Sequence, residues 1–157
     1  MNDEARDLTA LICNHEDRLE KIRELVDSAL ENEIKLLGKT SASALIIAGL
    51  LENYYTCLET IFVRISQFFE NNLDSVRWHS DLLQKMTLNI EGVRAAVVSQ
   101  ESFPALFELL KFRHFKRYYF DLEYDWDRMD FLLLKLRKVH PMVERDLDRF
   151  VQFLEAI

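Results

Sequence analysis

The chain of 157 residues contains few of the residues that make tight turns, with only three glycines and two prolines. An all-β fold needs a turn about every 8–12 residues, so this scarcity argues against a β-sandwich or a β-barrel. It also leaves almost no material for a glycine-rich phosphate loop, and neither G-x-x-x-x-G-K-[ST] nor G-x-G-x-x-G occurs. The composition therefore indicates a helical protein.

Cysteine and long hydrophobic runs are also scarce. Cys13 and Cys57 are the only cysteines and form no C-x-x-C pair, so they cannot build a disulfide framework. The uncharged run over residues 40–51 is too short to span a bilayer, and the acidic N-terminus lacks the layout of a signal peptide. We therefore expect a cytoplasmic protein with no membrane partner.

Positive charge is in deficit, because 20 Lys and Arg residues face 27 Asp and Glu residues, which gives a net charge of −7. Phosphate binding depends mostly on neutralisation by Lys and Arg. The average charge therefore argues against a general nucleic-acid binder, and we expect no DNA partner. It does not exclude a local basic patch.

Hydrophobic residues, in contrast, are abundant at 49%, and they recur at helical spacing. Apolar positions alternate three and four residues apart over residues 4–37 and 41–72, which predicts two long antiparallel helices. Between them, Gly38 offers a C-cap and Thr40 an N-cap. The length and the apolar content fit one domain over residues 1–157.

Three further helices are expected in the second half, over residues 78–88, about 103–120, and from Asp125 or Asp127 to the end. In the last helix the apolar spacing continues from Met129 to Leu154 across Pro141, so we expect a kink near Arg137. The prediction is an all-α, up-and-down bundle of four main helices plus one short helix.

No metal site or cofactor is expected in this bundle. Helical bundles often hold di-iron sites built on Glu-x-x-His pairs, but none of the four histidines has a Glu three residues before it. His15 and His140 lie on apolar stripes, where a partly buried, hydrogen-bonded histidine is the simpler interpretation. For His79, at a helix start, we expect capping or packing, with a place at the rim of a cleft as the alternative.

One short segment departs from the acidic average. Residues 111–120 read Lys-Phe-Arg-His-Phe-Lys-Arg-Tyr-Tyr-Phe and carry a charge of +4, so the rest of the chain carries −11. Cations hold phosphates and aromatic rings stack on unpaired bases, a combination that suits RNA. The candidate RNA-binding residues are Lys111, Lys116, Arg117 and Tyr119. A solvated basic helix face is the alternative.

The phase of this helix adds a second observation. Phe103, Leu106 and Leu110 define an apolar stripe, and continuing its spacing places Arg113 and Arg117 on the same stripe. A buried charge is costly unless it is paired. The partners considered are Glu59, a phosphate and a second protomer.

Residues 112–120 resemble the signature of the HEPN superfamily, which is an Arg, often a polar residue next, a His five positions after the Arg and often a Tyr two beyond. Within that superfamily the chain looks like the HepT-like toxins of toxin–antitoxin pairs. Residues 53–62 resemble their second helix and residues 78–83 their short third helix, so the resemblance covers about residues 5–157.

The resemblance implies an α-bundle that usually dimerises and a metal-independent endoribonuclease. In such enzymes the Arg and His of both protomers face each other across the dimer cleft. The typical partner of a HepT-like toxin is an MNT-type nucleotidyltransferase antitoxin, which adenylylates the motif tyrosine. The family therefore implies three partners: RNA, a second copy of the chain and a nucleotidyltransferase.

This sequence departs from the signature at two positions. Arg113 matches the Arg and His114 the polar neighbour, but Tyr118 stands at the place of the His and Phe120 at the place of the Tyr. A tyrosine hydroxyl is a poor general base at neutral pH, and losing a positioned acid or base typically costs about 10²–10⁴-fold in rate. Phe120 has no hydroxyl to adenylylate, which leaves Tyr118 or Tyr119 as alternatives.

The hypothesis for catalysis is that Arg113, His114 and Tyr118 form the site. His114 and Tyr118 are four residues apart on one helix face, so His114 would transfer the proton and Tyr118 would donate a hydrogen bond. The alternative is a catalytically inactive HEPN module that binds RNA, a nucleotide or a nucleotidyltransferase partner. A helical interaction protein with no such site, its arginines paired internally with acids, is the third interpretation.

Overall fold

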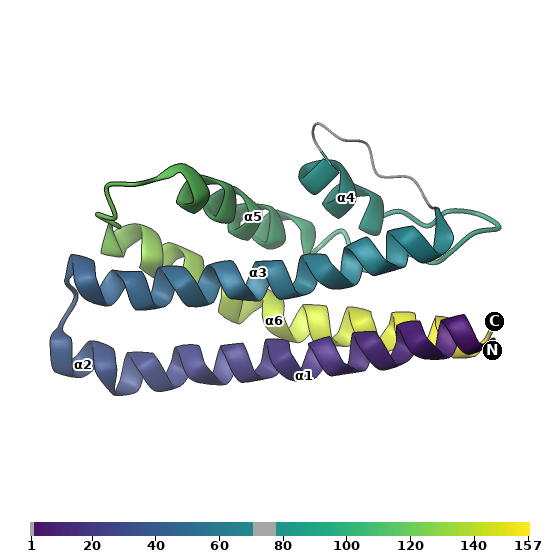
Figure 1. The fold of residues 1–157 in the computed structure, drawn as a ribbon, viewed down its shortest axis with the longest axis horizontal. Helices are drawn as coiled ribbons and strands as arrows, with labels where there is room; N and C mark the ends of the chain where they lie inside the picture. The colour runs from purple at the N-terminus through teal and green to yellow at the C-terminus, as the bar shows by residue number, and fades with distance from the viewer. Residues whose placement is uncertain (1, 71–77) are drawn as a thin grey trace.

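The computed structural model describes residues 2–70 and 78–157, which form helices joined by short connections (Figure 1). The helices are α1 (Asp3–Glu31), α2 (Glu33–Leu37), α3 (Ser41–Phe69), α4 (Trp78–Met86), α5 (Phe103–Tyr118) and α6 (Trp126–Glu155). Among the described residues the β-type pairing is limited to an isolated bridge between Ile90 and Arg94. The predicted all-α class is confirmed.

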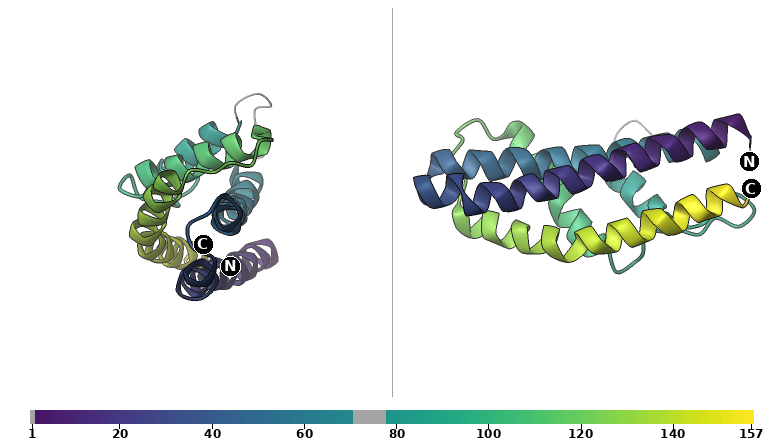
Figure 2. Two further views of the ribbon diagram at one scale, coloured as in Figure 1. Left: turned by 90° about the vertical axis from the view of Figure 1, so that its left-hand side faces the viewer. Right: turned by 90° about the horizontal axis from the view of Figure 1, so that it is seen from below.

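The four long helices α1, α3, α5 and α6 form the bundle, and successive members run in opposite directions (Figure 1). α1 packs against α3 and α6, and α5 packs against the same two helices from the other side. The short α4 lies against α3 and α5. The chain termini lie together at one end of the bundle, as both views in Figure 2 show.

The connection between α1 and α3 differs from the prediction in one respect. The helix expected over residues 4–37 is interrupted at Asn32, after which α2 continues it for five residues. Gly38 then ends α2 with a φ of +76°, a conformation that favours glycine. Thr40 and Ser43 form a capping box at the start of α3. The end predicted for this helix, residue 72, lies outside the described residues.

The predicted apolar stripes face the core. Every stripe position in α6, from Met129 to Leu154, is buried, and His140 among them is 2% exposed. Pro141 lies inside α6 without ending it, and the right-hand view of Figure 2 shows the helix changing direction along its length. A proline removes one backbone hydrogen bond of the preceding turn, which is the physical reason for such a bend.

The stretch between α4 and α5, for which the sequence predicts no helix, is held in place by two buried charged residues. Arg94 is 2% exposed and pairs with Glu70 at 2.6 Å. Asp146 on α6 is fully buried and accepts hydrogen bonds from the Ser99 amide and the Ser102 hydroxyl, at 2.8 and 2.9 Å. These contacts fix where α5 begins relative to α3 and α6.

Candidate functional site

Arg113 lies on the buried face of α5, as the helix phase predicts. Its guanidinium binds the Glu59 carboxylate of α3 through two parallel hydrogen bonds, Nη1 to Oε1 at 2.8 Å and Nη2 to Oε2 at 3.0 Å. The two residues are 5% and 6% exposed. Of the three partners considered for this arginine, Glu59 is the one that this structure provides, in the bidentate geometry that gives strong ion pairs.

A histidine from a third helix joins this pair. Nδ1 of His79, on α4, lies 2.9 Å from Oε2 of Glu59 and 3.0 Å from Nη2 of Arg113. The guanidinium also lies over the Tyr55 ring, 5.0 Å from its centroid. We call Glu59, Arg113 and His79 the buried-arginine cluster. Because they come from α3, α5 and α4, only the tertiary structure brings them together.

The side chain of Tyr55 lines this cluster, and its hydroxyl is an unusually weak acid. Burial, and then the nearby Glu59 carboxylate, raise the pKa of its hydroxyl well above the ordinary value, while Arg113 partly opposes the shift. The hydroxyl makes no hydrogen bond with the described residues. Tyr55 therefore stays protonated and offers a donor beside the guanidinium.

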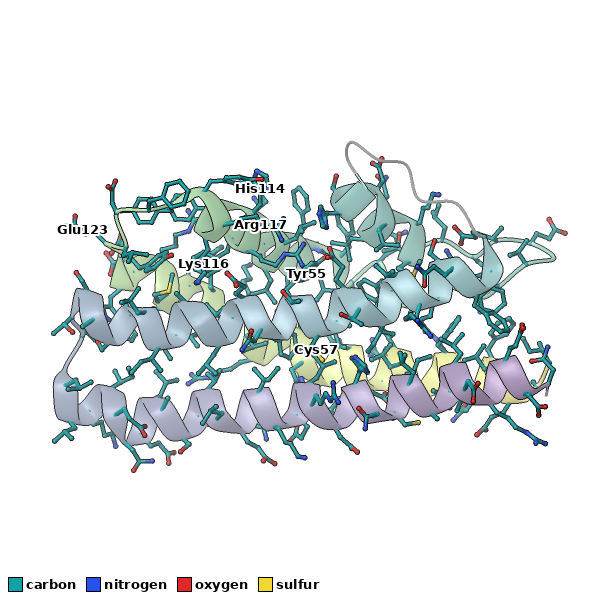
Figure 3. All side chains as sticks on the ribbon, viewed as in Figure 1. Tyr55, Cys57, His114, Lys116, Arg117 and Glu123 are labelled. Carbon is teal, nitrogen blue, oxygen red and sulfur yellow. The ribbon has the colours of Figure 1, made fainter. Side chains whose placement is uncertain are left out.

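His114 and Tyr118 lie on the solvent-exposed side of α5, away from the buried-arginine cluster. Their rings meet edge to face with centroids 5.2 Å apart, so the two residues lie on one helix face, as their spacing predicts. Tyr118 is 62% exposed, and His114 points away from α3 (Figure 3). Within one chain, the predicted catalytic set is thus divided between the buried Arg113 and an exposed pair.

The predicted RNA-binding residues are also divided. Lys111 and Arg117 are exposed, and Lys111 forms an ion pair of 2.8 Å with Glu108. Lys116 instead points toward α3 and pairs with Glu52 at 3.2 Å (Figure 3). Tyr119 is half-buried, and its hydroxyl donates to the carbonyl oxygen of residue 123 at 3.1 Å.

The prediction that Arg117 lies on the apolar stripe is wrong. Arg117 is exposed and has no ion-pair partner among the described residues. The physical reason is that α5 ends one residue later, at Tyr118. The apolar stripe therefore does not continue along the helix beyond this point. A cation in the last helical turn is stabilised by the helix dipole without needing a buried partner.

The exposed residues in the last eight positions of α5 form a continuous strip, which we call the α5 face. It comprises Lys111, His114, Phe115, Arg117 and Tyr118. Phe115 is 39% exposed and stacks on Tyr119 with centroids 4.7 Å apart. The strip combines cations with rings, the groups that hold a phosphate backbone and stack on bases.

The HepT-like protein family matches residues 46–154. The chain belongs to this family. The matched part contains all of α4 and α5, nearly all of α6 and most of α3, and so both the buried-arginine cluster and the α5 face. The comparisons with curated proteins and with solved structures give no match.

The two positions at which the sequence is expected to depart from the HEPN signature lie on the surface of this HepT-like protein. Tyr118 is 62% exposed and Phe120 is 83% exposed. Among the described residues, no helix of this HepT-like protein is both long and apolar enough to cross a membrane.

Proposed function

We propose that this HepT-like chain is a HEPN-type module that binds unpaired RNA along its α5 face, with cleavage impaired. The arrangement of Arg113 is the observation that supports this function best. Cleavage needs a free guanidinium for the charged phosphorane, close to a proton-transfer group. Here both terminal nitrogens of Arg113 are bound by Glu59, and His114 lies on the exposed side of α5.

The α5 face supplies what binding alone needs. Lys111 and Arg117 place two cations about two helical turns apart, where they contact successive phosphates. Tyr118, 62% exposed, offers a ring on which a base stacks. Unpaired RNA is the substrate class because its bases are free to stack, whereas those of a duplex are not.

Fluorescence anisotropy with a short, labelled, unstructured RNA tests this proposal. Tyr118→Ala should cost about 1–3 kcal/mol of binding free energy, the range for loss of one stacking ring. Arg117→Ala should weaken binding and reduce its salt dependence between about 50 and 200 mM. Arg6→Ala is the matched control, since Arg6 is an arginine on α1 whose side chain is 65% exposed.

Two results would reject the proposal. One is the absence of RNA binding at low salt, and the other is an equal loss in Arg6→Ala and Arg117→Ala. Duplex DNA of the same length serves as the competitor, and we expect it to displace the RNA poorly.

A second candidate, metal-independent RNA cleavage, is favoured by the position of His79. Its Nδ1 lies 3.0 Å from Nη2 of Arg113, so an Arg–His pair exists in space although the motif histidine is replaced. In this reaction the 2′-hydroxyl gives up its proton to a base, for which His79 is the candidate, and its oxygen attacks the phosphorus. The 5′-oxygen leaves and takes up a proton, and a 2′,3′-cyclic phosphate forms. Arg113 would have to exchange Glu59 for the phosphate.

Incubation of the purified chain with RNA in EDTA decides between the two candidates. Cleavage that is lost in His79→Ala and retained in His114→Ala would support the His79 site. The reverse result would support the site first predicted from the sequence. If the RNA stays intact, the result supports a module that binds RNA without cleaving it. Tyr118→His restores the motif histidine and tests whether its loss is what impairs cleavage.

From the family resemblance we also propose an MNT-type nucleotidyltransferase as a partner. We further propose that the protein is located in the cytoplasm. Phe120 has no hydroxyl and that of Tyr119 is hydrogen-bonded, so the exposed Tyr118 is the acceptor we favour. Incubation with such an enzyme and ATP should add the mass of one AMP. Tyr118→Phe should abolish this addition and Tyr119→Phe should not.

A further inference from the structure

The seam between α1 and α6 holds a cluster of potential metal ligands that RNA binding does not use. Nε2 of His140 lies 2.6 Å from Oε2 of Glu20 and 2.5 Å from Oε1 of Glu144. The three ligand atoms lie within 4.8 Å of one another. Glu20 comes from α1 and the other two from α6, and these helices lie side by side (Figure 2). We call these three residues the seam cluster.

The imidazole of His140 is held in one orientation. It is 2% exposed, and its Nδ1 lies 2.8 Å from the hydroxyl oxygen of Tyr54 on α3. With Nδ1 bound to the Tyr54 hydroxyl, Nε2 is the ring nitrogen that faces the two carboxylates, and a metal ion there would take the place of the Nε2 proton. Metal-binding histidines are commonly fixed in this way, by a hydrogen bond on the ring nitrogen that does not bind the ion.

Of the two carboxylates in the seam cluster, that of Glu144 is poorly compensated. One N–H on Nε2 cannot make two good hydrogen bonds to two carboxylates at once. Arg23 donates hydrogen bonds to both oxygens of Glu20, at 2.6 and 3.0 Å, but Glu144 has no Lys or Arg partner among the described residues. Two converging anions beside one nitrogen favour the entry of a cation.

The neighbouring charges point the same way. Glu16, four residues before Glu20, is half-buried, and burial with the nearby Asp148, Asp17 and Glu144 raises the pKa of its carboxyl to about 7. Every charge that contributes to this shift is negative. The seam therefore carries surplus negative charge around a buried imidazole.

We propose that Glu20, His140 and Glu144 bind a divalent transition-metal ion, with Zn²⁺ the best fit, which joins the first long helix to the last. One imidazole and two carboxylates suit Zn²⁺, and water completes the tetrahedral set. The Glu-x-x-His spacing does not find this site because Glu144 follows His140 by four residues and Glu20 lies in another helix. The proposal is independent of RNA binding.

Zn²⁺ titration of the EDTA-treated, tag-free chain by calorimetry tests it. We expect one Zn²⁺ per chain and a higher melting temperature with Zn²⁺ present. Glu144 is 52% exposed in its side chain, so Glu144→Gln should fold normally. This variant should lower the affinity for Zn²⁺ by more than roughly 10–100-fold, which is the cost of losing a residue that is only hydrogen-bonded to a metal ligand. The matched control is Glu24→Gln, an exposed glutamate on α1 outside the cluster.

Nitrogen NMR of the histidine rings separates this site from nonspecific binding. Zn²⁺ should shift the Nε2 signal of His140 and leave the signals of His15, which lies on α1, unchanged. The proposal is overturned if no saturable one-to-one binding occurs. It is equally overturned if Glu144→Gln binds like Glu24→Gln, or if Zn²⁺ shifts His15 and not His140.

Discussion

At the scale of single residues, the Arg113–Glu59 pair is the most consequential contact in the core. Arg113→Ala should lower the free energy of unfolding by about 3–5 kcal/mol, because it leaves the Glu59 carboxylate buried without its partner. Urea unfolding followed by circular dichroism measures this loss. Arg117→Ala, an exposed neighbour, should change stability by no more than about 0.5 kcal/mol.

A double variant separates charge from packing in this prediction. Arg113→Met combined with Glu59→Met removes both charges and keeps apolar volume, so it should recover most of the loss. If the double variant is as unstable as Arg113→Ala, the contact of the guanidinium with the Tyr55 ring is the main contribution instead.

A second residue-scale prediction concerns pH. In the folded chain, burial and the neighbouring carboxylates raise the pKa of Glu16 from its ordinary value of 4.5 to about 7. The stability that this shift provides is therefore fully present below about pH 4.5 and is lost as the pH rises through 7. Glu16→Gln should raise the urea midpoint at pH 8 and change it little at pH 4.

The measurement is made in EDTA, so that no metal contributes, with Glu24→Gln as the control. Hydrogen bonds from Arg23 and His140 lower the pKa of Glu20 to about 2, and its contribution to stability is lost as the pH falls from 4.5 toward 2. Because Glu20 is present in both proteins, this loss is common to their two profiles. If wild type and Glu16→Gln keep parallel profiles from pH 4 to pH 8, the carboxyl does not titrate as stated.

At the scale of elements, hydrophobic periodicity predicted α3 and α6 well, because it reports directly which helix face is buried. The break at Asn32 was missed, since no glycine or proline marks it. There both the backbone and side-chain nitrogens of Asn32 donate to the carbonyl oxygen of Ser28, at 3.0 and 2.9 Å. Such local competition for a carbonyl is not visible as a change of periodicity.

The start of α3 carries the element-scale prediction. Thr40 accepts a hydrogen bond from the amide of Ser43 at 3.1 Å, and its own carbonyl accepts from the Trp126 indole at 2.8 Å. Thr40→Ala removes only the side-chain cap and should cost about 1 kcal/mol of stability. Thr56→Ala, at an exposed position inside α3, is the control. Equal losses in the two variants would show that the cap contributes nothing.

At the scale of the whole molecule, the sequence predicted the fold class and the burial of Arg113 but not what surrounds that arginine. Helix phase predicted that Arg113 needs a partner and left Glu59, a phosphate and a second protomer open, whereas His79 required the placement of α4 against α3 and α5. The seam cluster required the packing of α1 on α6. Contacts between helices depend on how the helices pack in three dimensions. The hydrophobic periodicity of the sequence does not contain that information.

The last whole-molecule prediction is the homodimer that family resemblance implies. The end of α5 and the chain after it expose Tyr118, Phe120 and Leu122, with Phe120 at 83%. Single exposed apolar residues are ordinary, but a run of them beside a cationic helix face is typical of an interaction surface. Sedimentation equilibrium should therefore find a dimer, and Phe120→Gln should weaken its association.

Leu25→Gln is the matched control for this surface, because Leu25 is 54% exposed on α1, a helix that does not touch α5. A monomeric wild-type chain, or equal weakening in both variants, would contradict the predicted surface. A dimer that dissociates in Phe120→Gln but retains RNA affinity would separate the two roles of this end of α5. RNA binding would then depend on the α5 face of one chain alone, and a shared cleft would be unnecessary for it.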